Sequence, residues 1–279
     1  MVEASKKIRA YLRSPDRVRR NFSSKIAICG KGGTGKSTVL ALLANALDEE
    51  GKAVLVVDTD ESNPGLYRMF GFDKKPKPLM ALLSRFSFDE PKPNTEWLMR
   101  EEIAIQDIPS EYILDSAGLK FLMVGKIEDP FQGCACTMAD VVRDFMGKLV
   151  LGENEIVLLD MEAGIESFGR GVERNVDTVL VVVEPSFESL ALAEKISYLA
   201  DGIGVNRVNA ILNKVSSDEK EVRMKTDLLR KGIRPIGTIW YHSQISEAGF
   251  EGKAIFDLND SKITESVKKI ARRLLEEPD

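Results

Sequence analysis

A glycine-rich stretch near the start of the chain has the residue types and the spacing to bind phosphate. It reads Gly-Lys-Gly-Gly-Thr-Gly-Lys-Ser-Thr and fits the pattern G-x-x-x-x-G-K-[ST]. Glycines let the backbone curl, so that successive N–H groups point at phosphate oxygens. Lys36 is placed to reach the β- and γ-phosphates, and Ser37 to ligate Mg²⁺. The stretch predicts a nucleoside triphosphate site made of Gly30, Lys31, Gly32, Gly33, Thr34, Gly35, Lys36, Ser37 and Thr38.

The elements that must position this loop lie on either side of it. Residues 26–29 are a continuous apolar run, which predicts a buried strand, and residues 36–50 repeat apolar side chains at helical spacing. A helix that begins there points its positive end at the phosphates. Further apolar runs of strand length lie at 53–57, 119–124, 155–159, 179–183, 208–212 and 235–239. We therefore expect an α/β fold of the P-loop NTPase type, a mostly parallel sheet of about seven strands with helices on both faces.

Carboxylates follow two of the predicted strands, at the strand ends where α/β folds place their ligands. Asp58 and Asp60 follow the strand at 53–57, and Asp160 follows the strand at 155–159. An apolar strand that ends in aspartate is the Walker B pattern, in which Asp160 holds a water on Mg²⁺. A solvated acidic turn is the alternative interpretation of Asp58 and Asp60.

A second lysine in the glycine-rich loop, Lys31, is not explained by the basic motif, because Lys36 already meets the phosphate charge. With it the loop resembles the deviant Walker A motif of the MinD, ParA and nitrogenase iron protein superfamily. The resemblance implies an ATP-dependent homodimer in which Lys31 reaches the partner's nucleotide. It also implies that Asp60 positions or activates the attacking water, that Asp58 supports Mg²⁺ and its waters, and that Asn213 contacts the adenine. The expected catalytic residues are Lys31, Lys36 and Asp60; an idle, solvated Lys31 and an Asn213 in an ordinary strand-end turn are the alternatives.

Two of the three cysteines are separated by a single residue. Cys134 and Cys136 follow Gly133, and thiols at this spacing can ligate one soft metal ion. One chain supplies two ligands, so a set of four follows if a twofold dimer brings two pairs together. Two reduced cysteines without a ligand, or a redox pair, are the alternatives. Cys29 lies inside the first predicted strand and is expected to be inert packing.

The residues after the fourth predicted strand carry a second resemblance. The run Asp-Met-Glu-Ala-Gly-Ile-Glu at 160–166, with Gly-Arg-Gly at 169–171, resembles the nickel-insertion ATPases of carbon monoxide dehydrogenase, the CooC type. These proteins also carry a Cys-x-Cys loop ahead of this strand, although a proline often stands where this chain has Thr137. The resemblance implies that Cys134 and Cys136 bind Ni²⁺ or Zn²⁺ across the dimer. It also implies that the client is an apo carbon monoxide dehydrogenase or acetyl-CoA synthase.

Charge and hydropathy bear on the remaining function classes. No apolar stretch has the length of a membrane span and no signal-peptide core is present, which indicates a cytoplasmic protein without a membrane partner. Residues 1–24 form a basic N-terminal extension and residues 25–279 the ATPase domain. Residues 1–25 carry a net charge of +6, which leaves −11 on the rest and argues against broad nucleic-acid binding. One alternative is a ParA/MinD-like positioning ATPase on DNA or membrane, which only the positive charge of the N-terminal extension supports. The other is an iron–sulfur carrier like the nitrogenase iron protein.

Overall fold

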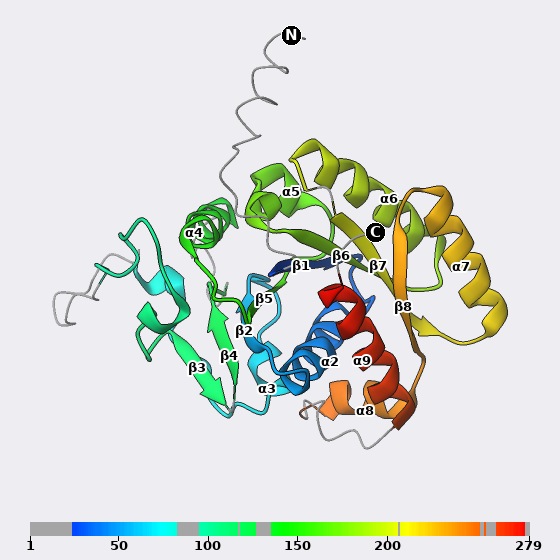
Figure 1. Ribbon diagram of the computed structural model, residues 1–279, viewed down its shortest axis with the longest axis horizontal. Coiled ribbons are helices and arrows are strands. Elements are labelled where there is room, and N and C mark those ends of the chain that lie inside the picture. Colours follow the sequence, from blue (N-terminus) through cyan, green and yellow to red (C-terminus); the bar gives the residue numbers. More distant parts are fainter. Residues whose placement is uncertain are drawn as a thin grey trace, which may run out of the picture.

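A twisted eight-stranded sheet forms the centre of the molecule (Figure 1). The computed structural model describes residues 24–82, 95–116, 118–126, 135–205, 207–251, 254 and 261–276. The strand order is β3-β4-β2-β5-β1-β6-β7-β8, and every neighbouring pair is parallel except β3 and β4. The strands are β1 (Lys25–Gly30), β2 (Ala53–Asp58), β3 (Ile113–Ser116), β4 (Leu119–Met123), β5 (Glu155–Asp160), β6 (Thr178–Val183), β7 (Arg207–Val215) and β8 (Arg234–Trp240).

The expected α/β fold with a mostly parallel sheet is confirmed, and the described residues contain one strand more than expected. The additional strand is β3, a short antiparallel strand at the edge of the sheet. Its residues are half-buried or exposed, so it lacks the continuous apolar run that marks the buried parallel strands.

Helices cover both faces of the sheet, and alternate residues of each strand face opposite layers (Figure 1). In β1, Ile26 and Ile28 pack against α2 and α9, whereas Ala27 and Cys29 belong to the core under α4, α6 and α7. The α-helices are α2 (Lys36–Glu49), α3 (Leu66–Met69), α4 (Ala135–Lys148), α5 (Glu166–Arg170), α6 (Phe187–Gly202), α7 (Asp218–Arg230), α8 (Ser243–Glu251) and α9 (Ser261–Leu275). Short 3-10 helices are η1 (Leu79–Leu82), η2 (Ile105–Asp107) and η3 (Val172–Asn175).

The register of the central strands brings the candidate site residues to one edge of the sheet. Asp58 is paired with Asp160 across β2 and β5, and with Met123 across β2 and β4. Ile28 is paired with Asp160 across β1 and β5. The loops that follow these four strands therefore emerge side by side, and this is the position at which ligands bind in open α/β sheets.

Two sequence predictions fall wholly or partly outside the described residues. The basic extension lies outside them except for Ser24, which is buried and donates hydrogen bonds from its backbone N–H and its hydroxyl to Asp177. Cys134 lies outside them as well, so its position stays a prediction. Along the described part of the chain, no helix has the length and apolar character needed to span a bilayer.

Candidate functional site

The loop between β1 and α2 presents the start of a helix that has no side-chain cap. Helix α2 begins at Lys36, and the residue before it, Gly35, adopts a left-handed conformation with φ of 89°. No side chain caps the first turn of α2, so its N–H groups are available to an anion, and the helix dipole favours negative charge there. Thr34 closes the turn by donating its backbone N–H and hydroxyl to the carbonyl oxygen of Lys31.

Two glycines of this loop stand where a side chain would collide with a neighbouring strand. A Cβ atom on Gly30 would lie 2.6 Å from the carbonyl oxygen of Val182 in β6. A Cβ atom on Gly35 would lie 2.5 Å from Nδ2 of Asn213 in β7. The motif glycines are thus required by the packing of the loop against the sheet as well as by its conformation.

Two residues at the end of β7 form hydrogen bonds to the phosphate loop. Nδ2 of the buried Asn213 donates a hydrogen bond of 2.8 Å to the carbonyl oxygen of Thr34. The next residue, Lys214, has a positive φ of 57° and donates to the carbonyl oxygen of Gly33. The predicted contact of Asn213 with adenine stays a prediction, and the observed contact is with the phosphate loop.

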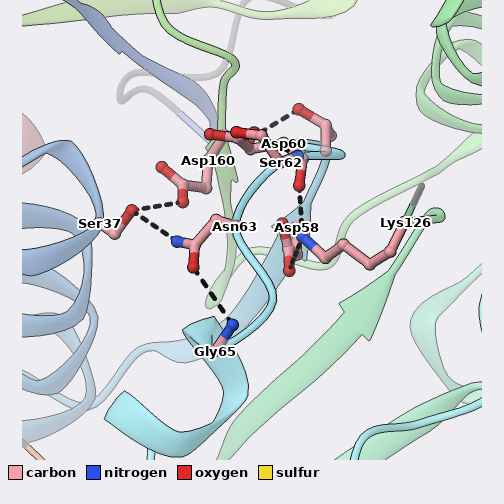
Figure 2. Close-up of polar contacts among 9 residues, drawn as sticks. Ser37, Asp58, Asp60, Ser62, Asn63, Gly65, Lys126 and Asp160 are labelled. Carbon is pink, nitrogen blue, oxygen red and sulfur yellow. Dashed lines mark hydrogen bonds and ion pairs between the residues drawn. The ribbon is translucent and has the colours of Figure 1, made fainter. Parts of the chain in front are cut away.

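The carboxylate of Asp160 lies beside the first turn of α2 (Figure 2). Ser37 Oγ donates a 2.8 Å hydrogen bond to Asp160 Oδ2, and Asn63 Nδ2 donates a 3.2 Å hydrogen bond to Ser37 Oγ. The other oxygen, Asp160 Oδ1, is buried and has no hydrogen-bond partner among the described residues. Burial, helped by the charge of Asp58, raises the pKa of Asp160 to about 7.

These residues fit a magnesium–nucleotide complex. Asp160 Oδ1 and the hydroxyl of Ser37 are hard oxygen ligands of the kind that Mg²⁺ prefers. Buried polar atoms normally have a partner, and a bound Mg²⁺ would supply one for Asp160 Oδ1. Mg²⁺ supplies charge that neutralises the phosphate oxygens when it is bound. Ser37 and Asp160 would hold it, and the backbone of residues 30–38 with Lys36 would hold the phosphates.

Lys126, which the sequence did not indicate as a site residue, lies beside Asp58 at the carboxyl end of β2. Lys126 Nζ lies 2.8 Å from Asp58 Oδ1 and 2.7 Å from Asp58 Oδ2, and it also donates to the main-chain oxygen of Asp60 (Figure 2). The side chains of Lys126 and Asp58 are only 7% and 2% exposed. Burial raises the pKa of Asp58 to about 6, while the Lys126 charge acts in the opposite direction. Asp58, expected to support Mg²⁺, is therefore paired within the protein.

The side chain of Asp60, the predicted water-positioning residue, is fixed by its own loop. It is buried, and Oδ1 accepts hydrogen bonds of 2.9 Å from the N–H of Ser62 and 2.6 Å from its hydroxyl (Figure 2). A carboxylate that bonds the backbone two residues on forms an Asx turn. The turn holds the side chain at the edge where Asp58 and Asp160 lie, and its role in hydrolysis stays a prediction.

The second lysine of the loop, Lys31, lies within ion-pair distance of its own subunit. Its Nζ is 3.8 Å from Glu184 after β6, and Lys214 Nζ is 3.6 Å from the same carboxylate. The Lys31 side chain is 40% exposed. An exposed pair of this kind contributes about 0–1 kcal/mol, so Glu184 holds Lys31 only weakly and leaves it available to another partner.

The described cysteines differ sharply in their surroundings. Cys29 is buried in the core, so its predicted role in packing is confirmed, and burial raises the pKa of its thiol well above the usual value. Cys136 is exposed in the first turn of α4. Within the described ranges, no three His, Cys, Asp or Glu side chains form a group that could hold a metal ion.

Helix α4 is linked to the loop that follows Asp160 through Arg170, the last residue of α5. Arg143 of α4 donates a 2.8 Å hydrogen bond to the carbonyl oxygen of Arg170, whose guanidinium lies 3.0 Å from Glu162 Oε2. A small hollow between α4 and this loop is lined by Met138, Val142, Glu162 and Arg170, and by Thr59 and Glu61 from the loop after β2. The helix that carries Cys136 therefore lines a common hollow with the loops that follow β2 and β5.

The raised pKa of Asp160 predicts that magnesium-dependent nucleotide binding weakens in acid. The form of Asp160 that would hold Mg²⁺ is the carboxylate, and below a pKa of about 7 the carboxylic acid predominates. We expect affinity for the magnesium–nucleotide complex to fall about tenfold between pH 8 and pH 6. In the free protein the sign is opposite, because the native state holds this proton to higher pH than the unfolded chain, and the free energy of unfolding falls as pH rises from about 4 to about 7.

Calorimetric titration at several pH values checks this expectation. The same titration in EDTA controls for the protonation of the nucleotide itself. An equal pH dependence with and without Mg²⁺ would rule out Asp160 as its origin.

The strand–loop–helix unit, the free helix start and the adjacent aspartates define a P-loop nucleotide-binding protein. The sequence profile of the CobQ/CobB/MinD/ParA nucleotide binding domain matches residues 25–255. The chain belongs to this family, and it is an ATP-binding protein of the MinD/ParA type, for which ATP hydrolysis is expected.

Three similar proteins place the chain within the family. The uncharacterized ATP-binding protein MJ0084 of Methanocaldococcus jannaschii is 36% identical over 83% of this chain and 93% of its own length. The carbon monoxide dehydrogenase accessory protein CooC of Rhodospirillum rubrum is 32% identical over 84% of this chain and 90% of its own length. The cell division ATPase MinD of Pyrococcus furiosus superimposes with a TM-score of 0.68 at 20% identity, over 90% of this chain and 98% of that one, and shows the shared fold.

Proposed function

We propose that this chain is a cytoplasmic Mg²⁺-dependent ATPase that assists nickel insertion into carbon monoxide dehydrogenase or acetyl-CoA synthase. Its ATP-linked dimer binds Ni²⁺ or Zn²⁺ between Cys134 and Cys136 of one subunit and the same pair of its partner. The similarity to the CooC accessory protein supports this proposal over most of the chain. The observation that carries it is the exposed thiol of Cys136 on a helix that lines a hollow together with both nucleotide-site loops.

This placement suits a cation carrier driven by ATP. Thiolates favour thiophilic ions such as zinc and nickel over Mg²⁺. The cysteine pair would therefore bind Ni²⁺ or Zn²⁺, whereas Ser37 and Asp160 would bind Mg²⁺. A metal site made of two half-sites changes geometry when the subunits rotate, and γ-phosphate loss alters the loops that set that rotation. Reduced cysteines of this kind also suit the cytoplasm, where disulfides are rare.

Activation of a client enzyme tests the function directly. Apo carbon monoxide dehydrogenase is incubated with Ni²⁺, ATP and the purified chain, and CO oxidation is then measured. We expect activation that needs ATP and is lost with Cys134→Ser/Cys136→Ser. Activation by the double variant, or none by the wild type with this client and with acetyl-CoA synthase, would contradict the proposal.

The proposed dimer predicts a specific defect for Lys31. In Lys31→Ala, the nucleotide keeps its own loop but loses the ammonium that the partner's Lys31 would supply. We expect this variant to bind ATP and to stay monomeric at ATP concentrations that dimerise the wild type. Light scattering with a non-hydrolysable analogue measures the difference.

Lys225→Ala serves as the matched control, because Lys225 forms an exposed ion pair with Glu221 on α7. It is expected to dimerise like the wild type. A fully dimeric Lys31→Ala protein would show that Lys31 is the idle lysine of the alternative interpretation.

A further inference from the structure

The ammonium group of Lys126 contacts Asp58 at the end of β2 and Asp60 in the loop that follows. Its Nζ donates hydrogen bonds to Oδ1 of Asp58 and to the main-chain oxygen of Asp60, and it lies in ion-pair contact with Oδ2 of Asp58 (Figure 2). An ammonium has three N–H donors and no acceptor, so these three oxygens surround it with acceptor groups of one loop and the strand before it. Because both side chains are almost fully buried, neither charge can turn to water if the other moves. A displacement of the Asp60 backbone must therefore move Lys126 or break a charged hydrogen bond.

The backbone beside Lys126 is in turn packed against the helix that carries Cys136. A Cβ atom on Gly125 would lie 2.9 Å from Sδ of Met138 in α4 and 2.7 Å from Cγ of Met80 in η1. The absence of a side chain at Gly125 thus lets Met138 lie directly on the chain. Met80 also donates its N–H to the carbonyl oxygen of Val124, over 2.8 Å, which fixes the segment from the other side.

These contacts form a continuous path of described residues between the two sites. The path runs from the Asp60 backbone through Lys126 and Gly125 to Met138, which lies two residues after Cys136 in α4. We propose that Lys126 is a positioning residue that couples the nucleotide-site loop to the cysteine-bearing helix through its contacts with Asp58 and Asp60. That this coupling serves metal transfer rests on the proposed function. Whether nucleotide binding changes the position of α4 through Lys126 can be tested in the metal-free protein.

The rate at which Cys136 is alkylated reports the position of α4. N-ethylmaleimide is added to the metal-free protein with and without a saturating non-hydrolysable ATP analogue and Mg²⁺, and modification is followed by peptide mass spectrometry. Buried Cys29 is the internal reference, since it reacts only if the protein unfolds. Rates are compared at equal dimer fraction, measured by light scattering in the same samples.

We expect the analogue to change the Cys136 rate in the wild type by about fivefold or more, the size of a typical allosteric coupling. In Lys126→Met the change falls to within about twofold of unity, and Lys126→Arg, which keeps the charge and the donors, restores part of it. Lys120→Met is the matched control, because Lys120 lies on β4, the strand that precedes Lys126, and also pairs with an aspartate, Asp115 of the edge strand β3. It is expected to behave like the wild type.

A nucleotide effect of wild-type size in Lys126→Met, or no effect in the wild type, would overturn the proposal. If reactive Cys29 shows that Lys126→Met is unfolded, the double variant Lys126→Met/Asp58→Asn is measured instead, because it leaves no buried charge unpaired. A nucleotide effect of wild-type size in this double variant would likewise overturn the proposal, and loss of the effect would support it. Failure of metal binding would contradict the proposed function and leave this result standing.

Discussion

Replacing Gly35 by alanine is expected to lower the affinity for ATP by about 100-fold. The left-handed conformation costs a non-glycine residue about 1–2 kcal/mol. The new methyl group would also displace Nδ2 of Asn213, which lies 2.5 Å from its position, and would break the hydrogen bond to Thr34 at a further cost of about 1–3 kcal/mol. A combined loss of about 3 kcal/mol corresponds to that factor. Calorimetric titration with ATP and Mg²⁺ measures it.

The matched control is Gly51→Ala, at the other end of α2. Gly51 also has a positive φ, of 81°, but a Cβ atom there would meet nothing within 4 Å. Its substitution carries the conformational strain without the collision, and we expect ATP affinity to stay within about twofold of the wild type. Equal losses in the two variants would show that strain in α2, and not the Asn213 contact, shapes the phosphate loop.

The largest loss of stability is expected from Lys126→Met. The substitution leaves the Asp58 carboxylate buried without its cation, and removing one partner of a buried pair costs about 3–5 kcal/mol. Urea unfolding at pH 7.5 measures the free energy of unfolding. Lys120→Met removes an exposed pair and is expected to cost at most about 1 kcal/mol.

The cost of Lys126→Met is also expected to depend on pH. The pKa of Asp58 is about 6 in the wild type, above its ordinary value, and loss of Lys126 raises it further. Near pH 5 Asp58 takes up a proton and no longer needs a cation, so the difference between variant and wild type shrinks in acid. A difference that stays constant from pH 8 to pH 5 would show that packing of the lysine stem, and not its charge, is what the variant loses.

Much of the sheet could be predicted from sequence because its strands are buried on both faces. Continuous apolar runs predicted seven strands, and each is found within a few residues of its expected bounds. Strand β3 was missed because it is short and half-exposed. Helix α7 was missed because its exposed face is rich in charge and only Met224 and Leu228 are buried.

The residues of the phosphate loop are contiguous in the sequence, and the strand and helix on either side of it are found where the motif predicts them. The side chains that hold it are distant in the chain. Asn213 and Lys214 reach the loop from β7, and Lys126 reaches Asp58 across 68 residues. Such contacts depend on the order of strands in the sheet. The pairing of β4 with β2 would have pointed to Lys126, since the carboxyl ends of neighbouring parallel strands meet at one edge.

The metal content of the anaerobically purified protein tests the central claim most directly. Wild type and Cys134→Ser/Cys136→Ser are compared, with oligomeric state read on the same column. The proposed function predicts one Ni²⁺ or Zn²⁺ for each dimer of the wild type and none in the double variant. A dimer that holds no metal in either form, or that keeps it without the cysteines, would contradict the claim, and a brown, iron-containing protein would indicate an iron–sulfur carrier instead.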